Sequence, residues 1–226
     1  MIIQTVNLCK RYKNGITALH NITLDIERGE FVFLTGQSGA GKSTLIRLLF
    51  REEMPTSGQI IVGGRSILRL SSRDTVLLRR NTGVIFQDFR LMEKNTVFDN
   101  VSFAMKAVER PPDEIARRVP KVLERVGLLK RADDIVETLS GGEQQRVAVA
   151  RAIINNPLII FADEPTGDLD PKTSAELMLL LSEINQEGTT IVMATHDKNI
   201  VDAMQKRVIT LSGGRMISDA VGGFQL

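Results

Sequence analysis

Residues 36–43 combine three glycines, a lysine and two serines at a spacing suited to holding phosphate groups. This segment reads Gly-Gln-Ser-Gly-Ala-Gly-Lys-Ser, follows an apolar run at 31–34 and precedes a helical pattern that begins at Leu45. Glycines let the backbone curl so that its N–H groups face a phosphate, and the helix N-terminus adds a favourable dipole. The pattern predicts a phosphate-binding loop, with Lys42 reaching the phosphates and the Ser43 hydroxyl binding Mg²⁺. The residues expected to surround the nucleotide here are Gly36, Gln37, Ser38, Gly39, Ala40, Gly41, Lys42, Ser43 and Thr44.

Two adjacent acids end a second apolar run, which spans residues 158–162. Acids at the carboxyl end of a buried strand lie where open α/β sheets bind their ligands. We expect Asp163 to hold Mg²⁺ and Glu164 to orient and deprotonate an attacking water. A solvated pair of acids at a strand end is the alternative, and the nearby phosphate loop argues against it.

A third segment, Leu-Ser-Gly-Gly-Glu-Gln-Gln-Arg at 139–146, predicts a helix that begins after Ser140. Ser140 and Glu143 have the spacing of a capping box, and Gly141 and Gly142 leave the first backbone N–H groups uncovered. An exposed helix N-terminus of this kind can bind an anion. The local pattern alone favours an ordinary well-capped helix.

Apolar patterns elsewhere predict an α/β fold with a mainly parallel sheet. Residues 2–8 and 22–26 alternate as strands of a half-buried antiparallel sheet, whereas the continuous apolar runs at 31–34, 159–162, 191–194 and 208–211 predict strands buried on both faces. Helical spacing lies between these runs, and Asp170-Pro171 provides a cap and first residue for one helix. Buried strands that alternate with helices are typical of this fold class.

Residues 88–156 interrupt the alternation with helical patterns and no clear strand. We therefore expect one domain over 1–226, with a core at about 1–87 and 157–226 and an inserted helical subdomain at about 88–156. Pro111-Pro112 separates two of its helices, and Gly127 is the expected end of the second. Pro120 lies inside that second pattern and should kink or break the helix.

Composition excludes several classes of protein. The 226 residues are 42% hydrophobic and 25% charged, which is ordinary for a globular protein. The net charge of +2 gives no sign of a nucleic-acid partner, and the single cysteine, Cys9, permits neither an intrachain disulfide nor a cysteine metal cluster. We expect no signal peptide and no membrane-spanning segment, because no apolar run approaches about 20 residues.

Taken together, these motifs resemble the ATP-binding cassette (ABC) ATPases. Segments 36–44, 139–146 and 158–166 are similar to the family's Walker A, signature and Walker B motifs, and they occur in the family's order over nearly the whole chain. Four weaker matches gain meaning only from this context. Gln87 matches the Q-loop, Asp168 lies in the match to the D-loop, His196 matches the switch histidine and Tyr12 matches the aromatic residue that stacks on adenine.

The resemblance implies a P-loop NTPase (RecA-like) core with an N-terminal antiparallel β subdomain, and it implies ATP and Mg²⁺ as cofactors. It assigns catalysis to Lys42, Glu164 and His196, and metal contacts to Ser43, Gln87 and Asp163. It also implies an ATP-dependent homodimer, in which Ser140, Gly141, Gly142 and Glu143 of one copy meet the ATP held by the other. Hydrolysis would then release the dimer.

Within the family, segments 83–92 and 191–197 are most similar to ATPases of bacterial cell division, which act with a membrane protein on the cytoplasmic face of the cell membrane. Phe89, Leu91 and Met92 are candidates for that contact, and burial within the helical insert is the alternative. Three departures, Gln37, Met92 and Asp168, leave that subfamily open. Three rivals remain: the ATPase of a lipoprotein-release or efflux transporter, an ABC ATPase without a membrane partner, and a nucleotide-dependent scaffold with negligible turnover, against which Glu164 and His196 argue.

Overall fold

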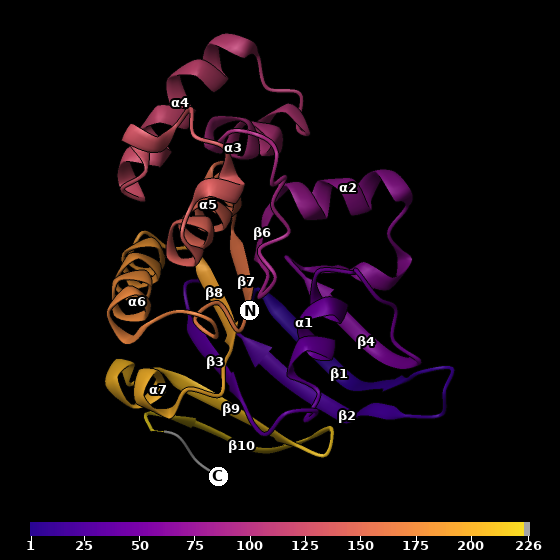
Figure 1. Cartoon of the computed structure of the whole chain (residues 1–226). Helices are drawn as coiled ribbons and strands as arrows, with labels where there is room; N and C mark the ends of the chain where they lie inside the picture. The colour runs from indigo at the N-terminus through magenta and orange to yellow at the C-terminus, as the bar shows by residue number, and fades with distance from the viewer. Residues whose placement is uncertain (224–226) are drawn as a thin grey trace.

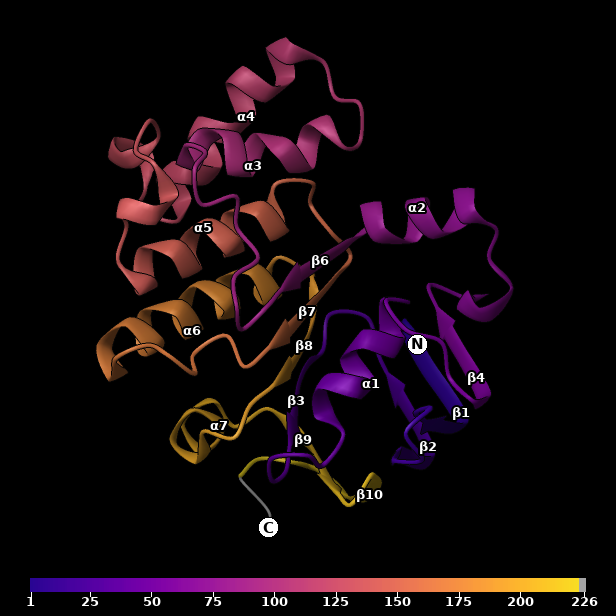
Figure 2. The ribbon, with the colours of Figure 1, turned by 45° about the vertical axis from the view of Figure 1, so that its right-hand side comes forward.

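Two β-sheets pack against opposite sides of one helix, which follows the glycine-rich segment (Figures 1 and 2). The computed structural model describes residues 1–223. Its strands are β1 (Ile3–Arg11), β2 (Thr17–Ile26), β3 (Phe31–Thr35), β4 (Ser57–Val62), β5 (Arg65–Ser66), β6 (Thr82–Ile85), β7 (Ile159–Asp163), β8 (Thr190–Ala194), β9 (Arg207–Ser212) and β10 (Arg215–Val221). Its α-helices are α1 (Lys42–Leu49), α2 (Ser72–Arg80), α3 (Val97–Lys106), α4 (Pro112–Arg125), α5 (Gly141–Ile153), α6 (Pro171–Gln186) and α7 (Lys198–Met204). Short 3₁₀ turns lie at Ile67–Arg69, Leu129–Arg131 and Val136–Thr138.

The larger sheet has the strand order β10-β9-β3-β8-β7-β6 and is parallel except for the β9–β10 hairpin at its edge. All five residues of β3 are buried, as its continuous apolar run predicts. Phe31 and Phe33 belong to one hydrophobic core and Val32 and Leu34 to another, because successive side chains on a strand point to opposite faces. The sheet is therefore covered on both faces, and the expected mainly parallel α/β fold is confirmed.

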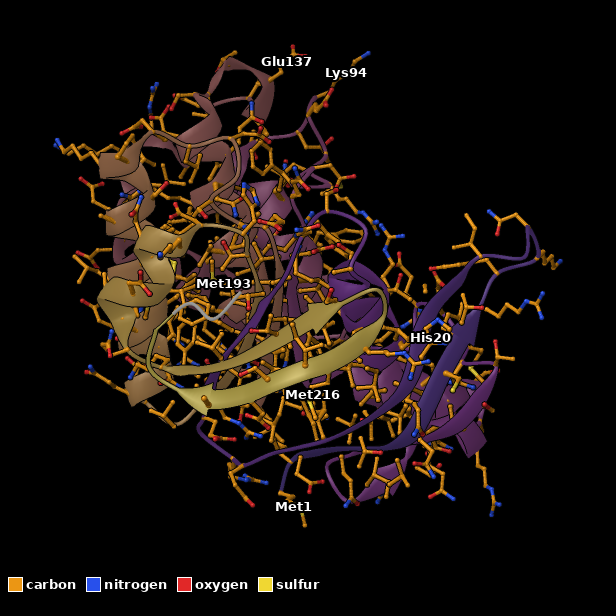
Figure 3. The ribbon with its side chains drawn as sticks, turned by 90° about the horizontal axis from the view of Figure 1, so that it is seen from below. Met1, His20, Lys94, Glu137, Met193 and Met216 are labelled. Carbon is orange, nitrogen blue, oxygen red and sulfur yellow. The ribbon has the colours of Figure 1, made fainter. Side chains whose placement is uncertain are left out.

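The smaller sheet is antiparallel, with the order β2-β1-β4-β5. Ile3 pairs with Ile26 and Leu8 with Ile22, so the alternating apolar residues of the two strands share one buried face. That face packs on α1. Figure 3 shows the β9–β10 hairpin, with Met216, crossing the lower side of the molecule beside the strand that carries His20.

Helices α3, α4 and α5 form the upper part of the molecule in Figure 1, above the edge strand β6 and its neighbour β7. An isolated antiparallel bridge joins Thr96 to Ile135, and Figure 3 shows Lys94 and Glu137 at the same outer end of this region. The expected break at Pro120 is wrong, because α4 runs unbroken from 112 to 125. Pro120 has no N–H to donate to the carbonyl of Ala116. Ala116 is exposed, so water can bond to that carbonyl instead.

Candidate functional site

A pocket of about 520 Å³ opens over the start of α1. The phosphate loop between β3 and α1 forms its floor, and the region after β7 and β8 adds Glu164 and His196. The residues lining it are Ile16, Thr17, Ala18, Ser38, Gly39, Ala40, Gly41, Lys42, Ser43, Thr44, Gln87, Glu164 and His196. The pocket lies at the carboxyl ends of parallel strands, where α/β sheets hold their ligands.

The phosphate loop is held in a tight curl by Lys42. Its ammonium group donates to the carbonyl of Gly36 at 2.9 Å and to that of Gln37 at 3.4 Å. Gly36 has a φ of 136°, and a Cβ atom there would lie 2.1 Å from the carbonyl oxygen of Leu211. No side chain caps the first turn of α1, so the backbone N–H groups of that turn face the pocket without a side-chain acceptor. This cradle fits the phosphates of a nucleotide.

Ser43 and Asp163 meet at the side of the pocket nearest β7. The Ser43 hydroxyl donates to Oδ1 of Asp163 at 2.8 Å. Burial raises the pKa of Asp163, the Ser43 hydrogen bond opposes that shift, and the charge of Glu164 adds to it. A hydroxyl and a half-buried carboxylate suit Mg²⁺, which usually keeps several waters and is bound through one or two protein groups together with phosphates. Within residues 1–223, no three His, Cys, Asp or Glu side chains cluster as a metal site would require. This does not conflict with Mg²⁺ binding, because Mg²⁺ needs only one or two protein groups here.

The carboxylate of Glu164 lies between two cationic or polar partners. One oxygen is 3.6 Å from Nζ of Lys42, and the other is 2.8 Å from Nδ1 of His196 and accepts from its backbone N–H at 3.3 Å. Glu164 also has a φ of 48°, which is uncommon for a residue with a Cβ and is found at sites where function requires strain. Its own N–H donates to the carbonyl of Ala194, which fixes this backbone on the neighbouring strand. The structure thus brings together the three expected catalytic side chains.

Gln87 and Tyr12 differ in their relation to the pocket. Gln87 follows β6 and lines the pocket. Tyr12 is outside the described lining, and its hydroxyl contacts the Thr44 hydroxyl at 3.2 Å and Glu53 at 3.1 Å, while the ammonium of Lys10 lies 4.9 Å from its ring centre. Tyr12, which is predicted to stack on adenine, therefore lies beside the phosphate loop and is bonded there through its hydroxyl group.

The expected signature residues form the beginning of α5, away from the described lining of the pocket. Ser140 accepts from the N–H of Glu143, and the Glu143 carboxylate accepts from the N–H and hydroxyl of Ser140. These two contacts with Ser140 lower the pKa of Glu143. Gly141 has open space where a Cβ would stand, whereas a Cβ on Gly142 would lie 2.8 Å from the Thr173 methyl group on α6.

Asp168 is exposed in the turn before α6 and is likewise outside the described lining. Within one chain, the structure therefore assembles the phosphate loop, Glu164, Gln87 and His196 around one pocket, with Asp163 bonded to Ser43 of its lining. It leaves Asp168 and the residues at 140–143 on separate surfaces.

Three lining residues, Ile16, Thr17 and Ala18, were missed by the sequence patterns. Thr17 and Ala18 begin β2 and Ile16 directly precedes it, opposite the end of β1, where Arg11 pairs with Thr17. Their side chains carry no distinctive chemistry, and only the antiparallel pairing of the two strands brings them to the loop.

Comparisons with known proteins agree on one family. A family model described as ABC transporter matches residues 19–167. The cell division ATP-binding protein FtsE of Mycobacterium tuberculosis is 50% identical over 224 residues, which cover 99% of this chain and 97% of that protein. FtsE of Bacillus subtilis is 48% identical over 222 residues, covering 98% of this chain and 97% of that protein.

Solved structures give the same result. The ATP-binding cassette MJ0796, a dimer in a post-hydrolysis state bound to ADP and Pi, has a TM-score of 0.89 at 36% identity, over 98% of this chain and 100% of that one. The cbiO1 protein of Clostridium perfringens, part of the ABC transporter complex cbiONQ, has a TM-score of 0.88 at 36% identity, over 97% of this chain and 88% of that one. The chain therefore belongs to the ABC transporter family and is one of its ATPase domains.

Proposed function

We propose that this ABC ATPase works in bacterial cell division, closing into a homodimer on ATP and driving a membrane protein of the FtsX type that controls peptidoglycan hydrolysis. Near-full-length identity of 44–50% to FtsE proteins supports the biological role. The observation that carries the chemistry is the convergence of Lys42, Glu164 and His196 on one pocket.

Each of these side chains has a distinct task in hydrolysis. Lys42 and the backbone N–H groups of the loop bind the phosphates and stabilise the charge that develops on them. Glu164 orients the attacking water and accepts its proton, because its carboxylate faces the pocket beside Lys42. His196 holds the second oxygen of that carboxylate and so positions the base.

Mg²⁺ would be held by Ser43 and Asp163, with Gln87, which also lines the pocket, as a further contact. When bound, it neutralises phosphate charge.

Dimerisation explains why the helix at 140–143 carries nucleotide-binding residues yet lies away from the pocket of its own chain. Gly141 is exposed with open space around it, so another molecule can approach the backbone N–H groups at the start of α5. The solved relative MJ0796 is a dimer with ADP and Pi. We therefore propose that Ser140, Gly141, Gly142 and Glu143 of one copy, together with Asp168, face the ATP on the phosphate loop of the other.

Steady-state ATP hydrolysis tests the chemistry. The unmodified chain should release phosphate from Mg-ATP, Lys42→Ala should lose productive ATP binding, and Glu164→Gln should bind ATP while its turnover falls by at least about 100-fold. Full turnover by Glu164→Gln would remove Glu164 from the role of base.

Contact with the membrane protein is proposed for Phe89, Leu91, Met92 and the surface beside them. Phe89, Leu91 and Met92 are all half-buried. Leu91 packs against the core, and the backbone of Met92 is bonded to the side chain of Asn100. A neighbouring groove of about 320 Å³ lies between α2, β6 and α3, and its described lining includes Arg79, Arg80 and Arg151 but no carboxylate. That charge favours a cytoplasmic partner segment with acidic residues.

Association with the membrane must come through such a partner under this proposal, at the cytoplasmic face and at the division site. None of the helices in residues 1–223 has both the length and the apolarity needed to cross a membrane. The partner test is a pull-down of tagged Glu164→Gln from solubilised membranes with Mg-ATP, with Lys42→Ala as the control that cannot close on ATP.

Recovery of a membrane protein with an extracytoplasmic domain of the FtsX kind supports the division role. Recovery of a different permease would assign the chain to a lipoprotein-release or efflux transporter. A closed dimer that brings down no membrane protein would favour an ATPase without such a partner.

A further inference from the structure

The loop that carries Gln87 contains two consecutive residues in the left-handed backbone region. Phe89 has a φ of 54° and Arg90 a φ of 48°, and neither is a glycine. This conformation is strained for a residue with a Cβ, because the Cβ comes too close to the following carbonyl oxygen. Something in the surrounding structure must therefore hold the loop in place.

Arg151, in the last turn of α5, makes that contact. Its two terminal nitrogens donate to the carbonyl of Arg90 at 2.5 Å and to that of Phe89 at 2.6 Å. A guanidinium is a rigid fork of donors, so it fixes two neighbouring carbonyls at once. Burial, together with the charge of Arg90, lowers the pKa of Arg151. An arginine guanidinium nevertheless stays protonated in proteins.

The other side of the loop is anchored to the helix that follows the phosphate loop. The guanidinium of Arg90 lies 3.8 Å from the ring centre of Phe86 and donates to Glu52 at 2.8 Å, just beyond the end of α1. Gln87 lies just before the anchored residues Phe89 and Arg90 in sequence, and it lines the pocket. The position of its side chain thus depends on a backbone held from two sides.

We propose that Arg151 is a positioning residue for ATP hydrolysis: by holding the carbonyls of Phe89 and Arg90, it keeps Gln87 in the phosphate-loop pocket. This inference rests on the proposed hydrolytic function of the pocket. This role would connect both ends of α5 to the nucleotide. Ser140 caps the N-terminal end of the helix, and Arg151 near its C-terminal end contacts the Gln87 loop. Arg151 itself does not line the pocket.

The test compares Arg151→Ala with Arg118→Ala. Arg118 also contacts the C-terminal end of α5, donating to the carbonyl of Ile154 and pairing with Glu114 at 2.8 Å, and neither contact involves residues 86–92. Both variants lose an arginine-to-carbonyl contact at the same helix end, and only one loses contact with the Gln87 loop. Thermal unfolding of both variants controls for stability.

For Arg151→Ala we expect kcat to fall about tenfold with the KM for ATP changed less than about twofold, together with a higher Mg²⁺ concentration for half-maximal rate. Arg118→Ala should keep all three values within about twofold of the unmodified chain. Arg151→Lys, which retains the charge and can reach one carbonyl, should recover part of the rate.

A second variant distinguishes positioning from general packing. Phe89→Gly removes most of the cost of the left-handed backbone at that position, so adding it to Arg151→Ala should restore kcat by about threefold or more. These assays use the chain without a membrane partner, so any loss of partner contact at Phe89 does not enter them.

The inference fails if Arg151→Ala, folded and active, matches Arg118→Ala in kcat, KM and Mg²⁺ dependence, or if Phe89→Gly gives no recovery. Absence of ATP hydrolysis by the unmodified chain would instead contradict the proposed function. If Arg151→Ala does not fold, the same comparison between Arg151→Lys and Arg118→Lys decides, and equal kinetics of those two would overturn the inference.

Discussion

Replacing Gly36 with alanine should destabilise the fold far more than replacing Gly39, three residues along the same loop. Both have positive φ angles, 136° and 77°, but a Cβ on Gly36 would stand 2.1 Å from the carbonyl oxygen of Leu211, whereas a Cβ on Gly39 has no neighbour within 4 Å. Backbone strain costs roughly 1–3 kcal/mol at either position. The overlap with β9 adds roughly 1–3 kcal/mol only at Gly36, because the opposing atom is backbone and cannot rotate away.

Urea denaturation followed by far-ultraviolet circular dichroism measures this difference, since the chain has no tryptophan and one tyrosine. With a urea slope of roughly 1–3 kcal/mol/M, the extra cost should lower the midpoint of Gly36→Ala by about 1 M relative to Gly39→Ala. Equal midpoints and slopes for the two variants would refute the claim that the phosphate loop lies directly against the β9 backbone.

Three further substitutions separate stability from activity. Asp163→Asn should abolish Mg²⁺-dependent hydrolysis yet raise stability at neutral pH. Burial raises the pKa of Asp163, so its charged carboxylate destabilises the folded state as the pH rises through that pKa. The urea midpoints of this variant and the unmodified chain should therefore converge on acidification to below about pH 4. Ser140→Ala should cost about 1 kcal/mol, read from the same denaturation assay, because it removes the cap of α5. His196→Ala should change stability by less than about 0.5 kcal/mol, since the side chain is 69% exposed, while phosphate release falls because Glu164 loses its partner.

Local patterns sufficed for most of the fold. The buried strands at 31–35, 159–163 and 190–194 form from continuous apolar runs, and the helix caps at Asp170 and Ser140 depend on side chains within three residues. The sequence patterns gave no indication of α2 or β6. Only one residue of α2 is buried, so it has little apolar periodicity, and β6 has four residues including a glycine.

The sequence patterns could not predict how distant strands pair, and part of the site depends on that pairing. The phosphate loop and the acids after β7 are contiguous motifs, but Ile16, Thr17 and Ala18 reach the pocket only through the β1–β2 pairing. Arg151 gave no signal because an arginine in a helix is ordinary, and its role depends on the two carbonyls that it meets 61 and 62 residues away in sequence.

The most direct test of the account is the mass in solution of Glu164→Gln, measured by light scattering at high protein concentration with and without Mg-ATP. The account predicts single chains without nucleotide and a particle of two chains with Mg-ATP, since binding is intact and hydrolysis no longer releases the dimer. A second substitution, Ser140→Arg, should abolish that dimer by placing a bulky side chain at the start of α5. A single-chain mass for Glu164→Gln with saturating Mg-ATP would contradict the claim that two copies close on the nucleotide.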